Sequence, residues 1–380
     1  MTFSPADDAL LSRAVALAQQ SIGLSEPNPR VGCVLHDAAG LLAGEGFTQQ
    51  AGGPHAEVMA LRAATQAGKT LRGGTAWVSL EPCAHHGRTP PCCDALIAAG
   101  LARVVVAMTD PFPQVAGRGI ERLRAAGISV DLAPPGPAVD AAVALNIGFL
   151  SRVLRRKPWV RMKIAASLDG RTALANGVSQ WITGAVARAD GHAWRRRAGA
   201  ILTGIGTVLA DDPRLDVREL PTVVQPRRVV LDSGLATPPR SRVLQAPGNT
   251  LIVHADGADA NGERAAPLIA AGARLLALPA ADGRIDLPRL MAQLADEGVN
   301  ELHVEAGATL NAALLQARLV DELLVYLAPT LLGPGRDMAA LHPLQSLAQA
   351  ECFEFIDVGR VGPDLRVLAR ATHRLAFLTA

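Results

Sequence analysis

The spacing of apolar residues in the first part of the chain predicts strands and helices in alternation. Ser4 and Pro5 open a helical pattern with acidic residues in its first turn, which is typical of a capped helix. A predicted hairpin of strands 31–36 and 41–47 follows. The later elements are helices at 55–68, 92–100 and 117–127, and strands at 75–80, 103–108 and 128–133. This order indicates an α/β domain with a largely parallel sheet and helices on both faces.

The pattern changes at the proline- and glycine-rich segment 133–139, which precedes a long helical stretch ended by Pro158. We therefore expect a domain boundary near Lys157. The domains expected on this basis are residues 1–150 and residues 158–380.

In the second domain, stretches with the apolar spacing of strands again alternate with stretches with the apolar spacing of helices, starting with a strand at 159–167. Its last two strands, 351–359 and 364–370, are expected to pair antiparallel. Residues 167–183 and 205–218 carry no clear period and are predicted to be loops. The second half is therefore also α/β, with a mixed sheet.

The composition is typical of a globular protein of a reducing compartment. The 380 residues carry a formal net charge of +2, which argues against a strongly electrostatic nucleic-acid binder. Five cysteines, three of them near one another, suit a reducing cytosol better than a disulfide framework. The N-terminus lacks the pattern of a signal peptide, and no uninterrupted apolar run is long enough for a membrane span. We expect a cytoplasmic protein.

A candidate metal site lies at the starts of helices and the end of a strand. His55 precedes the helix of 55–68, Cys83 follows the strand of 75–80, and Cys92 opens a helix after two prolines. One imidazole and two thiolates leave a fourth position for water, as in catalytic zinc sites. Glu57 can then move protons between that water and a leaving nitrogen. The set matches the pattern of zinc deaminases, with eight residues between the cysteines instead of two.

Other polar residues of the first half leave alternatives open. Cys93 could be the ligand in place of Cys92, although the first thiol after the prolines is preferred. Asn28, held between two prolines, could read the edge of a heterocycle or could simply be a turn residue. His85 and His86 could line the pocket or lie exposed on a loop.

The second half shows no glycine-rich dinucleotide motif after a strand. Residues 306–309 follow a strand and open a helix, so their backbone N–H groups could hold a phosphate. A tight turn between a strand and a helix would favour glycine for structural reasons alone.

Taken together, these stretches resemble the bifunctional deaminase/reductase family of riboflavin biosynthesis. HAE, EPCAHHGRTPPCCDALIAAG and DPFPQVAGRGI are similar to its deaminase half, which has a cytidine-deaminase-like fold. MKIAASLDGRTA, SQWIT, TVLADDPRL and VEAGATL are similar to its reductase half, which has a dihydrofolate-reductase-like fold. The resemblance implies zinc-dependent deamination of a phosphoribosylated diaminopyrimidinone, then NADPH-dependent reduction of its ribosyl group to ribityl. It also implies a homodimer or higher homo-oligomer.

The resemblance assigns contacts residue by residue. It implies that Glu57 is catalytic and that His55, Cys83 and Cys92 hold Zn²⁺. The residues expected to contact NADPH are Ala165, Trp181, Thr207, Asp211, Ser233, Gly307, Ala308, Thr309, Leu310, Asn311, Ala312 and Ala313. Those expected to hold the phosphoribosyl substrate are Ser179, Arg195, Leu215, Arg218 and Glu305. The forked donors of Arg195 and Arg218 suit a phosphate, though surface ion pairs would be the simpler explanation of either arginine alone.

Two further readings share some of these residues. A nucleic-acid-acting deaminase with a C-terminal binding module would use the same zinc chemistry, but the near-neutral charge opposes it. A structural zinc domain attached to a reductase is opposed by three ligands beside a glutamate. Within the reductase half, Lys163 is expected to position or protonate the opening sugar.

Overall fold

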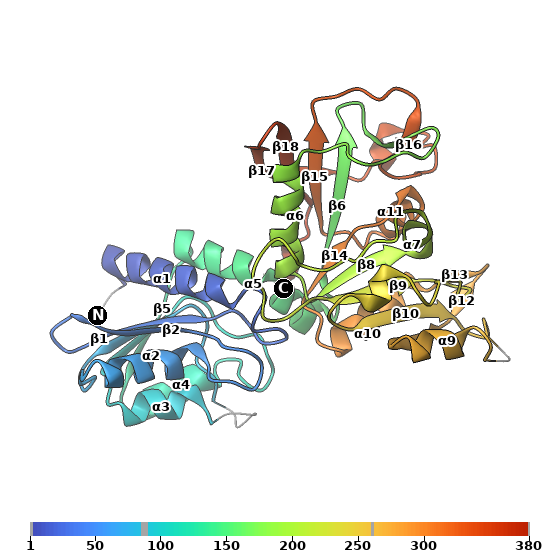
Figure 1. Ribbon diagram of the computed structural model, residues 1–380. Helices are drawn as coiled ribbons and strands as arrows, with labels where there is room; N and C mark the ends of the chain where they lie inside the picture. Colours follow the sequence, from blue (N-terminus) through green and yellow to red (C-terminus); the bar gives the residue numbers. More distant parts are fainter. Residues whose placement is uncertain (1–2, 85–89, 260–261, 379–380) are drawn as a thin grey trace. The chain divides into compact units, whose positions relative to one another are not determined.

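The chain forms two compact units, Met1–Arg155 and Arg156–Ala380 (Figure 1). The computed structural model describes residues 3–84, 90–259 and 262–378, so His85 and His86 lie outside the described residues. Each unit is described separately below.

The first unit is built on a five-stranded sheet of order β2-β1-β3-β4-β5. The hairpin of β1 and β2 pairs antiparallel, β1 pairs antiparallel with β3, and the remaining strands are parallel. Figure 1 shows α1 and α5 over one face of this sheet and α2, α3 and α4 over the other. The strands are β1 (Gly32–His36), β2 (Leu42–Phe47), β3 (Thr75–Val78), β4 (Arg103–Val106) and β5 (Ser129–Leu132). The helices are α1 (Pro5–Ala18), η1 (Gln19–Ser21), α2 (Ala56–Gln66), α3 (Cys92–Ala98), α4 (Arg118–Ala125) and α5 (Pro137–Arg155).

Two sequence signals explain how this unit is held together. Ser4 and Asp7 form the expected capping box of α1. The buried Asp7 carboxylate also pairs with Arg103 of β4, 2.7 Å away, which ties the helix to the sheet. On the other face, a Cβ on Gly46 would lie 2.5 Å from the carbonyl oxygen of Ala56. Glycine in β2 therefore lets α2 pack directly against the strand.

Helix α5 is long and apolar enough, by length and composition, to cross a membrane. Half of its most apolar window is buried inside the protein, and Ala138, Ala142 and Leu145 belong to the core under α1. This burial is typical of the core helix of a globular unit, and it explains the apolar composition.

The second unit contains a nine-stranded sheet of order β11-β10-β9-β8-β14-β6-β15-β18-β17. All neighbours are parallel except β15 with β18 and β18 with β17, so the expected antiparallel pairing of the last two strands is confirmed. The strands are β6 (Trp159–Ser167), β8 (Ala200–Gly204), β9 (Arg227–Leu231), β10 (Thr250–Ala255), β11 (Ala273–Leu278), β14 (Glu301–Val304), β15 (Glu322–Ala328), β17 (Phe353–Val361) and β18 (Asp364–Ala371).

The two faces of this sheet differ in character. One face carries an apolar core in which Val160, Met162 and Leu302 pack with Leu290 and Leu294 of a helix. On the opposite face, α6 contacts the sheet, with Ala187 and Trp194 against Leu324 and Tyr326 of β15. The helices are α6 (Ala185–Arg197), α7 (Ile205–Asp211), α8 (Arg242–Gln245), α9 (Ala265–Ala270), α10 (Leu287–Asp296), α11 (Ala308–Gln316), η2 (Leu347–Gln349) and η3 (Ala376–Leu378).

Two predicted loops of this unit are wrong. Residues 205–211 form α7, a short helix held by burial of Val208 against Ile201 and Val230. Residues 171–174 form β7 (Arg171–Leu174), which pairs with β16 (Gly335–Asp337), while β12 (Ala280–Ala281) and β13 (Arg284–Ile285) form another small ribbon. Helix α7 depends on packing against neighbouring strands, and β7 depends on a partner strand far along the chain, and local periodicity shows neither.

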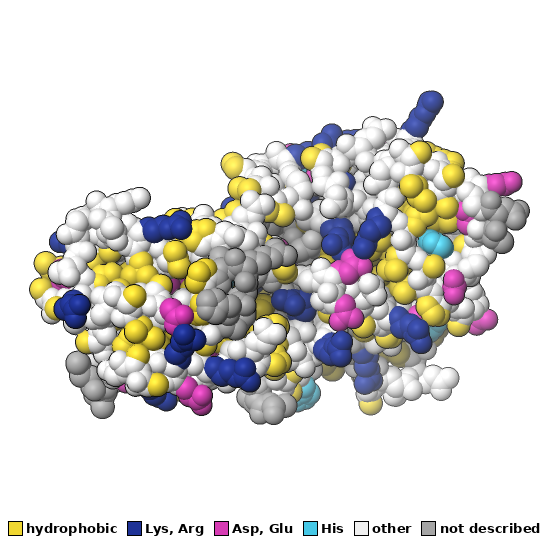
Figure 2. Space-filling view, turned by 90° about the horizontal axis from the view of Figure 1, so that it is seen from below, with side chains coloured by type: hydrophobic (Ala, Val, Ile, Leu, Met, Phe, Trp, Pro, Cys, Tyr) yellow, Lys and Arg dark blue, Asp and Glu magenta, His cyan; other side chains and the backbone are white. Residues whose placement is uncertain are grey.

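Charged side chains of both signs are mixed on the face of the molecule drawn in Figure 2. On the face drawn in Figure 2, lysine and arginine side chains lie among acidic and apolar ones and do not form one continuous basic area. This agrees with the near balance of 37 basic and 35 acidic residues.

Candidate active sites

The first site begins at the N-terminus of α2. His55 is the N-cap residue of this helix, with extended backbone angles, and Glu57 lies in its first turn. The Glu57 side chain is only 3 % exposed. Helix α2 packs directly on β2. It therefore holds the His55 imidazole and the Glu57 carboxylate at the same end of the sheet.

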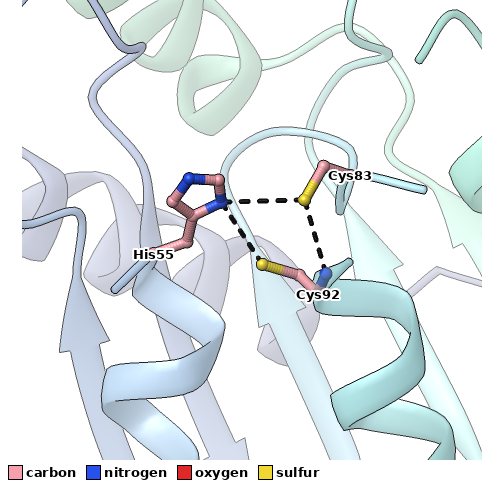
Figure 3. Close-up of side chains that lie close together, drawn as sticks. All are labelled: His55, Cys83 and Cys92. Atoms are coloured by element: carbon pink, nitrogen blue, oxygen red, sulfur yellow. Dashed lines mark hydrogen bonds between the residues drawn. The ribbon is translucent and has the colours of Figure 1, made fainter. Parts of the chain in front are cut away.

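Cys83 and Cys92 meet His55 at this end of the sheet (Figure 3). The Nδ1 atom of His55 lies 3.6 Å from Sγ of Cys83 and 3.4 Å from Sγ of Cys92. The three donor atoms lie within 4.8 Å of one another. One imidazole nitrogen and two sulfurs at this spacing fit a tetrahedral zinc ion, leaving one position for a non-protein ligand.

Hydrogen bonds keep the two cysteine segments in place. The backbone N–H of Cys92, at the first position of α3, points at Sγ of Cys83 from 3.4 Å. The Cys93 thiol faces the other way, with Sγ 3.3 Å from the carbonyl oxygen of Pro82 and 3.5 Å from that of Gly119. The geometry therefore groups Cys92, and not Cys93, with His55 and Cys83.

Electrostatics at this site favour one thiolate and a poised carboxyl group. A hydrogen bond from Cys92, followed by one from His55, lowers the pKa of Cys83 to about 4. The hydrogen bond to Cys83, together with burial, raises the pKa of Cys92, so the two thiols share one proton. Burial, reinforced by the negative charge of Cys83, raises the pKa of Glu57 to about 7. A carboxyl group with this pKa can both accept and donate a proton near neutral pH.

The loop after β3 is fixed by a residue that the pattern analysis passed over. The Glu81 carboxylate accepts hydrogen bonds from the backbone N–H groups of Asp110, Gly117, Gly119 and Ile120, at 2.9 to 3.2 Å. It joins the segment that bears Cys83 to the start of α4. The available signal was the buried acidic residue directly before Pro82, at a strand end.

The second site lies in the other unit, where β8 and β14 run parallel as neighbours. Their carboxyl ends lead into α7 and α11, and a Cβ on Gly307 would lie 3.9 Å from Oγ1 of Thr207. The N-termini of the two helices therefore adjoin, with Gly307 as the N-cap of α11. Open α/β sheets bind ligands at such strand ends.

The predicted cofactor residues of α11 lie along its first turns. The side chain of Asn311 is buried and donates to the carbonyl oxygen of Met338 at 2.9 Å, and Ala312 is also buried. The residues concerned are Ala308, Thr309, Leu310, Asn311, Ala312 and Ala313.

Arg195 and Glu305 form the centre of the second site. Arg195 of α6 donates from Nη2 to Oε2 of Glu305 at 2.9 Å and from Nη1 to the carbonyl oxygen of Asp216 at 3.1 Å. Nζ of Lys163, on β6, lies 4.0 Å from Oε2 of Glu305. Although partial burial opposes ionisation of Glu305, these cations hold its pKa well below its usual value, so it is ionised.

The segment after α7 is anchored by Asp216, which was not singled out from the sequence. This carboxylate is 1 % exposed and pairs with Arg218 at 3.0 Å and with Arg214 at 2.8 Å. Leu215, beside it, is buried with a positive φ of 50°. The signal was the R-L-D-V-R pattern, in which one acidic residue lies between two basic ones.

The remaining predicted residues lie at several positions of the second unit. Trp181 is 66 % exposed, with the Arg188 guanidinium 4.4 Å from its ring centre. Ala165 is on β6, in register with Tyr326. Ser179 follows β7, Asp211 is the last residue of α7, and Ser233 follows β9. The described contacts thus connect Arg195, Glu305 and the Leu215–Arg218 segment, and separately Thr207 with Gly307.

Comparison with known families matches each unit to a different description. Residues 4–108 match the cytidine and deoxycytidylate deaminase zinc-binding region, and residues 158–365 match the RibD C-terminal domain. The chain therefore carries a zinc-binding deaminase region and a reductase domain, which supports zinc and a nicotinamide cofactor.

Curated relatives match over nearly the whole length. The riboflavin biosynthesis protein RibD of Escherichia coli strain K12 is 48 % identical over 372 residues, covering 94 % of this chain and 98 % of the relative. RibD of Haemophilus influenzae is 41 % identical over 388 residues, covering 97 % and 98 %.

Solved structures give the same result. RibD of Acinetobacter baumannii (form 1) has a TM-score of 0.85 and 41 % identity, covering 97 % of this chain and 99 % of the other. A diaminohydroxyphosphoribosylaminopyrimidine deaminase/5-amino-6-(5-phosphoribosylamino)uracil reductase of Thermotoga maritima has a TM-score of 0.83 and 30 % identity, covering 96 % and 98 %.

Proposed function

The chain belongs to the RibD family of bifunctional riboflavin-biosynthesis enzymes, and from this premise we propose which of its residues carry each of the two reactions. The enzyme is a deaminase and a reductase. We propose that its substrate is 2,5-diamino-6-(5-phosphoribosylamino)pyrimidin-4-one, which is deaminated first and then reduced from the ribosyl to the ribityl form. The pairing of a zinc-type deaminase unit with a reductase unit in one chain supports these two reactions.

For the deamination, we propose that His55, Cys83 and Cys92 hold the zinc ion and that Glu57 is the proton carrier. Bound zinc would supply an activated water molecule at neutral pH. The Glu57 carboxylate would accept a proton at this position and donate it to the departing ring amine. Its burial and its pKa of about 7 suit both halves of this transfer.

For the reduction, we propose that Ser179, Arg195, Leu215, Arg218 and Glu305 hold the phosphoribosyl substrate. Arg218 is exposed and offers forked donors to a phosphate, while Asp216 fixes its direction. Glu305 is ionised and can accept hydrogen bonds from sugar hydroxyls. Lys163, whose pKa is lowered by burial, lies beside Glu305 and is suited to donate a proton to the opening sugar.

We propose NADPH as the hydride donor of the reduction. The adjoining starts of α7 and α11, with Thr207 and Gly307, would hold its phosphates through backbone N–H groups. The other proposed contacts are Ala165, Trp181, Asp211, Ser233 and residues 308–313. A ratio of kcat/KM for NADPH over NADH near or below one would contradict this choice.

We also propose a cytoplasmic homodimer formed through the second unit. All five cysteines are free, which suits a reducing compartment. Strand β17 forms one edge of the nine-stranded sheet and exposes 76 % of Phe355, 45 % of Ile356 and 52 % of Val358. An exposed apolar edge strand is suited to cover by a second copy. The mixed charge on the face drawn in Figure 2, the near-neutral net charge and the small-molecule chemistry give no support to a nucleic-acid partner.

The clustering of His55, Cys83 and Cys92 beside Glu57 is the observation that carries the deaminase assignment. The test is a coupled assay on the diaminopyrimidinone substrate that follows ammonia and NADPH oxidation separately. We expect a chelator or Glu57→Ala to abolish both signals, because no intermediate is made. Supplying the deaminated intermediate should restore NADPH oxidation in both cases. Ammonia release at the wild-type rate by Glu57→Ala would contradict the role of this carboxylate.

A further inference from the structure

The face of the second sheet that contacts α6 is unusual because its central strands carry ionisable side chains there. Side chains alternate along β14, so Glu301, His303 and Glu305 share one face. In the adjacent strand, Arg161 is the register partner of His303. The other face of the same strands is the apolar core of Val304 and Met162. Charged groups therefore occupy a buried layer between this sheet and α6.

The lower part of this layer is a closed ion-pair network. Arg161 is 3 % exposed and pairs with Glu301 at 2.7 Å and with Glu322 at 2.8 Å. Arg197 adds a second contact to Glu301 at 2.8 Å, and Arg370 adds one to Glu322 at 3.0 Å. These contacts fix Arg161 as a buried cation directly beside His303.

The upper part of the layer is the Arg195–Glu305–Lys163 group of the proposed substrate site. Oε2 of Glu305 accepts a hydrogen bond from Nη2 of Arg195 and faces Nζ of Lys163. Oε1 of Glu305 accepts a hydrogen bond from Nε of Arg195 and faces Nε2 of His303 at 3.4 Å. The imidazole thus lies between Arg161, its register partner in the adjacent strand, and the Oε1 side of this carboxylate.

His303 itself is completely buried and its polar atoms are not used elsewhere. The residue is 0 % exposed, and neither ring nitrogen has a hydrogen-bond partner among the described residues. The separation from Glu305 is within reach of a hydrogen bond, but the alignment is poor. Burying an imidazole whose two nitrogens make no hydrogen bond costs folding free energy, so such a residue calls for a functional explanation.

We propose that His303 is a positioning residue for the reductase reaction, a neutral imidazole whose Nε2–H supports Oε1 of Glu305 when the substrate draws this carboxylate from Arg195. This inference rests on the proposed role of Glu305 as a substrate contact. A cationic side chain at this position would be repelled by Arg161. An anionic one would be repelled by Glu301 and Glu305. A neutral donor satisfies both neighbours. Burial lowers the pKa of His303, which keeps the ring uncharged at neutral pH.

The test compares His303→Leu with His303→Gln in the full-length enzyme. Glutamine keeps a neutral N–H donor at similar reach, whereas leucine fills the space without one. For His303→Leu we expect the KM for the deaminated intermediate to rise about tenfold, the size of a lost hydrogen bond to a charged group. The KM for NADPH should stay within about twofold, because Glu305 is not among the proposed cofactor contacts. His303→Gln should recover most of the wild-type KM.

Two further measurements separate the possible failures. Deaminase activity of the same preparations and their thermal unfolding show whether the variant folds, so a loss of both activities would identify a merely structural role and overturn the proposal. Glu305→Gln and the double variant with His303→Leu complete a cycle, in which we expect non-additive effects. If Glu305→Gln leaves the KM unchanged, the substrate role of Glu305 fails. If Glu305→Gln raises the KM but His303→Leu does not, the role of His303 fails alone.

Discussion

At the scale of single residues, the thiols of the adjacent Cys92 and Cys93 point in different directions because the two residues begin a helix. Successive helical positions point about 100° apart, so only one of the two thiols can face His55. Cys92 does so, with 3.4 Å between its Sγ and Nδ1 of His55, whereas Cys93 faces two carbonyl oxygens. Both are completely buried, so exposure does not distinguish them.

Substitution of each cysteine tests the proposed ligand set. Cys92→Ala leaves two protein donors, and we expect the zinc retained after dialysis to fall from about one ion per chain to a small fraction. Cys93→Ala removes only a packed thiol and should keep about one ion per chain, with a modest loss of stability. Metal content is measured by atomic absorption on the purified variants. Zinc retained by Cys92→Ala and lost from Cys93→Ala would reverse the assignment.

The metal-binding group could be predicted from the sequence because each of its members has a local signal. His55 and Cys92 start helices, and Cys83 follows a strand and a proline. His303 gave no such signal, because its neighbour Arg161 lies in another strand that only the assembled sheet brings close. Asp216 had only its two flanking arginines as a signal, and its burial becomes evident only in the folded unit.

At the scale of elements, the first site depends on how the loop after β3 is attached to α4. Glu81 accepts hydrogen bonds from four backbone N–H groups, three of them at the N-cap or in the first turn of α4. The fit is tight, because a Cβ on Gly119 would lie 2.0 Å from the carbonyl oxygen of Pro82. The direction of Cys83 is therefore set by a helix that contributes no metal ligand.

Glu81→Gln should weaken this attachment. One carboxylate oxygen becomes an NH₂ group that faces backbone donors, so at least one buried hydrogen bond is lost, at about 2 kcal/mol of unfolding free energy. We expect zinc to transfer to a competing chelator several times faster than from the wild type, measured by stopped-flow absorbance. Glu121→Gln, on the exposed side of α4, is the matched control and should change neither quantity. Equal rates of zinc transfer from both variants would show that the hydrogen bonds of Glu81 do not hold the loop that bears Cys83.

Element prediction succeeded where a pattern was long and failed where tertiary contact decides. The helix after the cysteines and the last two strands have clear starts and periods. Helix α7 is only seven residues long and contains Gly206 and Thr207, which have low helix propensity, so its stability comes from the burial of Val208. Strand β7 needs β16 as a partner, more than 150 residues away, and neither has an alternating pattern of its own.

At the scale of the whole molecule, each unit has its own core and its own buried ion pairs. Asp7 and Arg103 stabilise the first sheet, and Arg161 with Glu301 and Glu322 stabilises the second. The proposed zinc ligands all belong to the first unit and the proposed NADPH contacts all belong to the second. Ligand binding should therefore stabilise one unit at a time.

Thermal unfolding of the intact enzyme tests this separation. A ligand present at about one hundred times its Kd stabilises its unit by about 2.7 kcal/mol, which shifts the Tm of a unit of this size by roughly 5–10 °C. We expect chelation of zinc to lower only the transition of the first unit, and NADPH to raise only that of the second. Calorimetry resolves the two transitions, and tryptophan fluorescence assigns them, since Trp77 lies in the first unit and Trp159, Trp181 and Trp194 lie in the second. NADPH added to the chelated enzyme is the control, and it should shift the second transition by the same amount as before. A single transition that moves with both ligands would mean that the two units unfold together, and the reductase site would then depend on metal bound in the other unit.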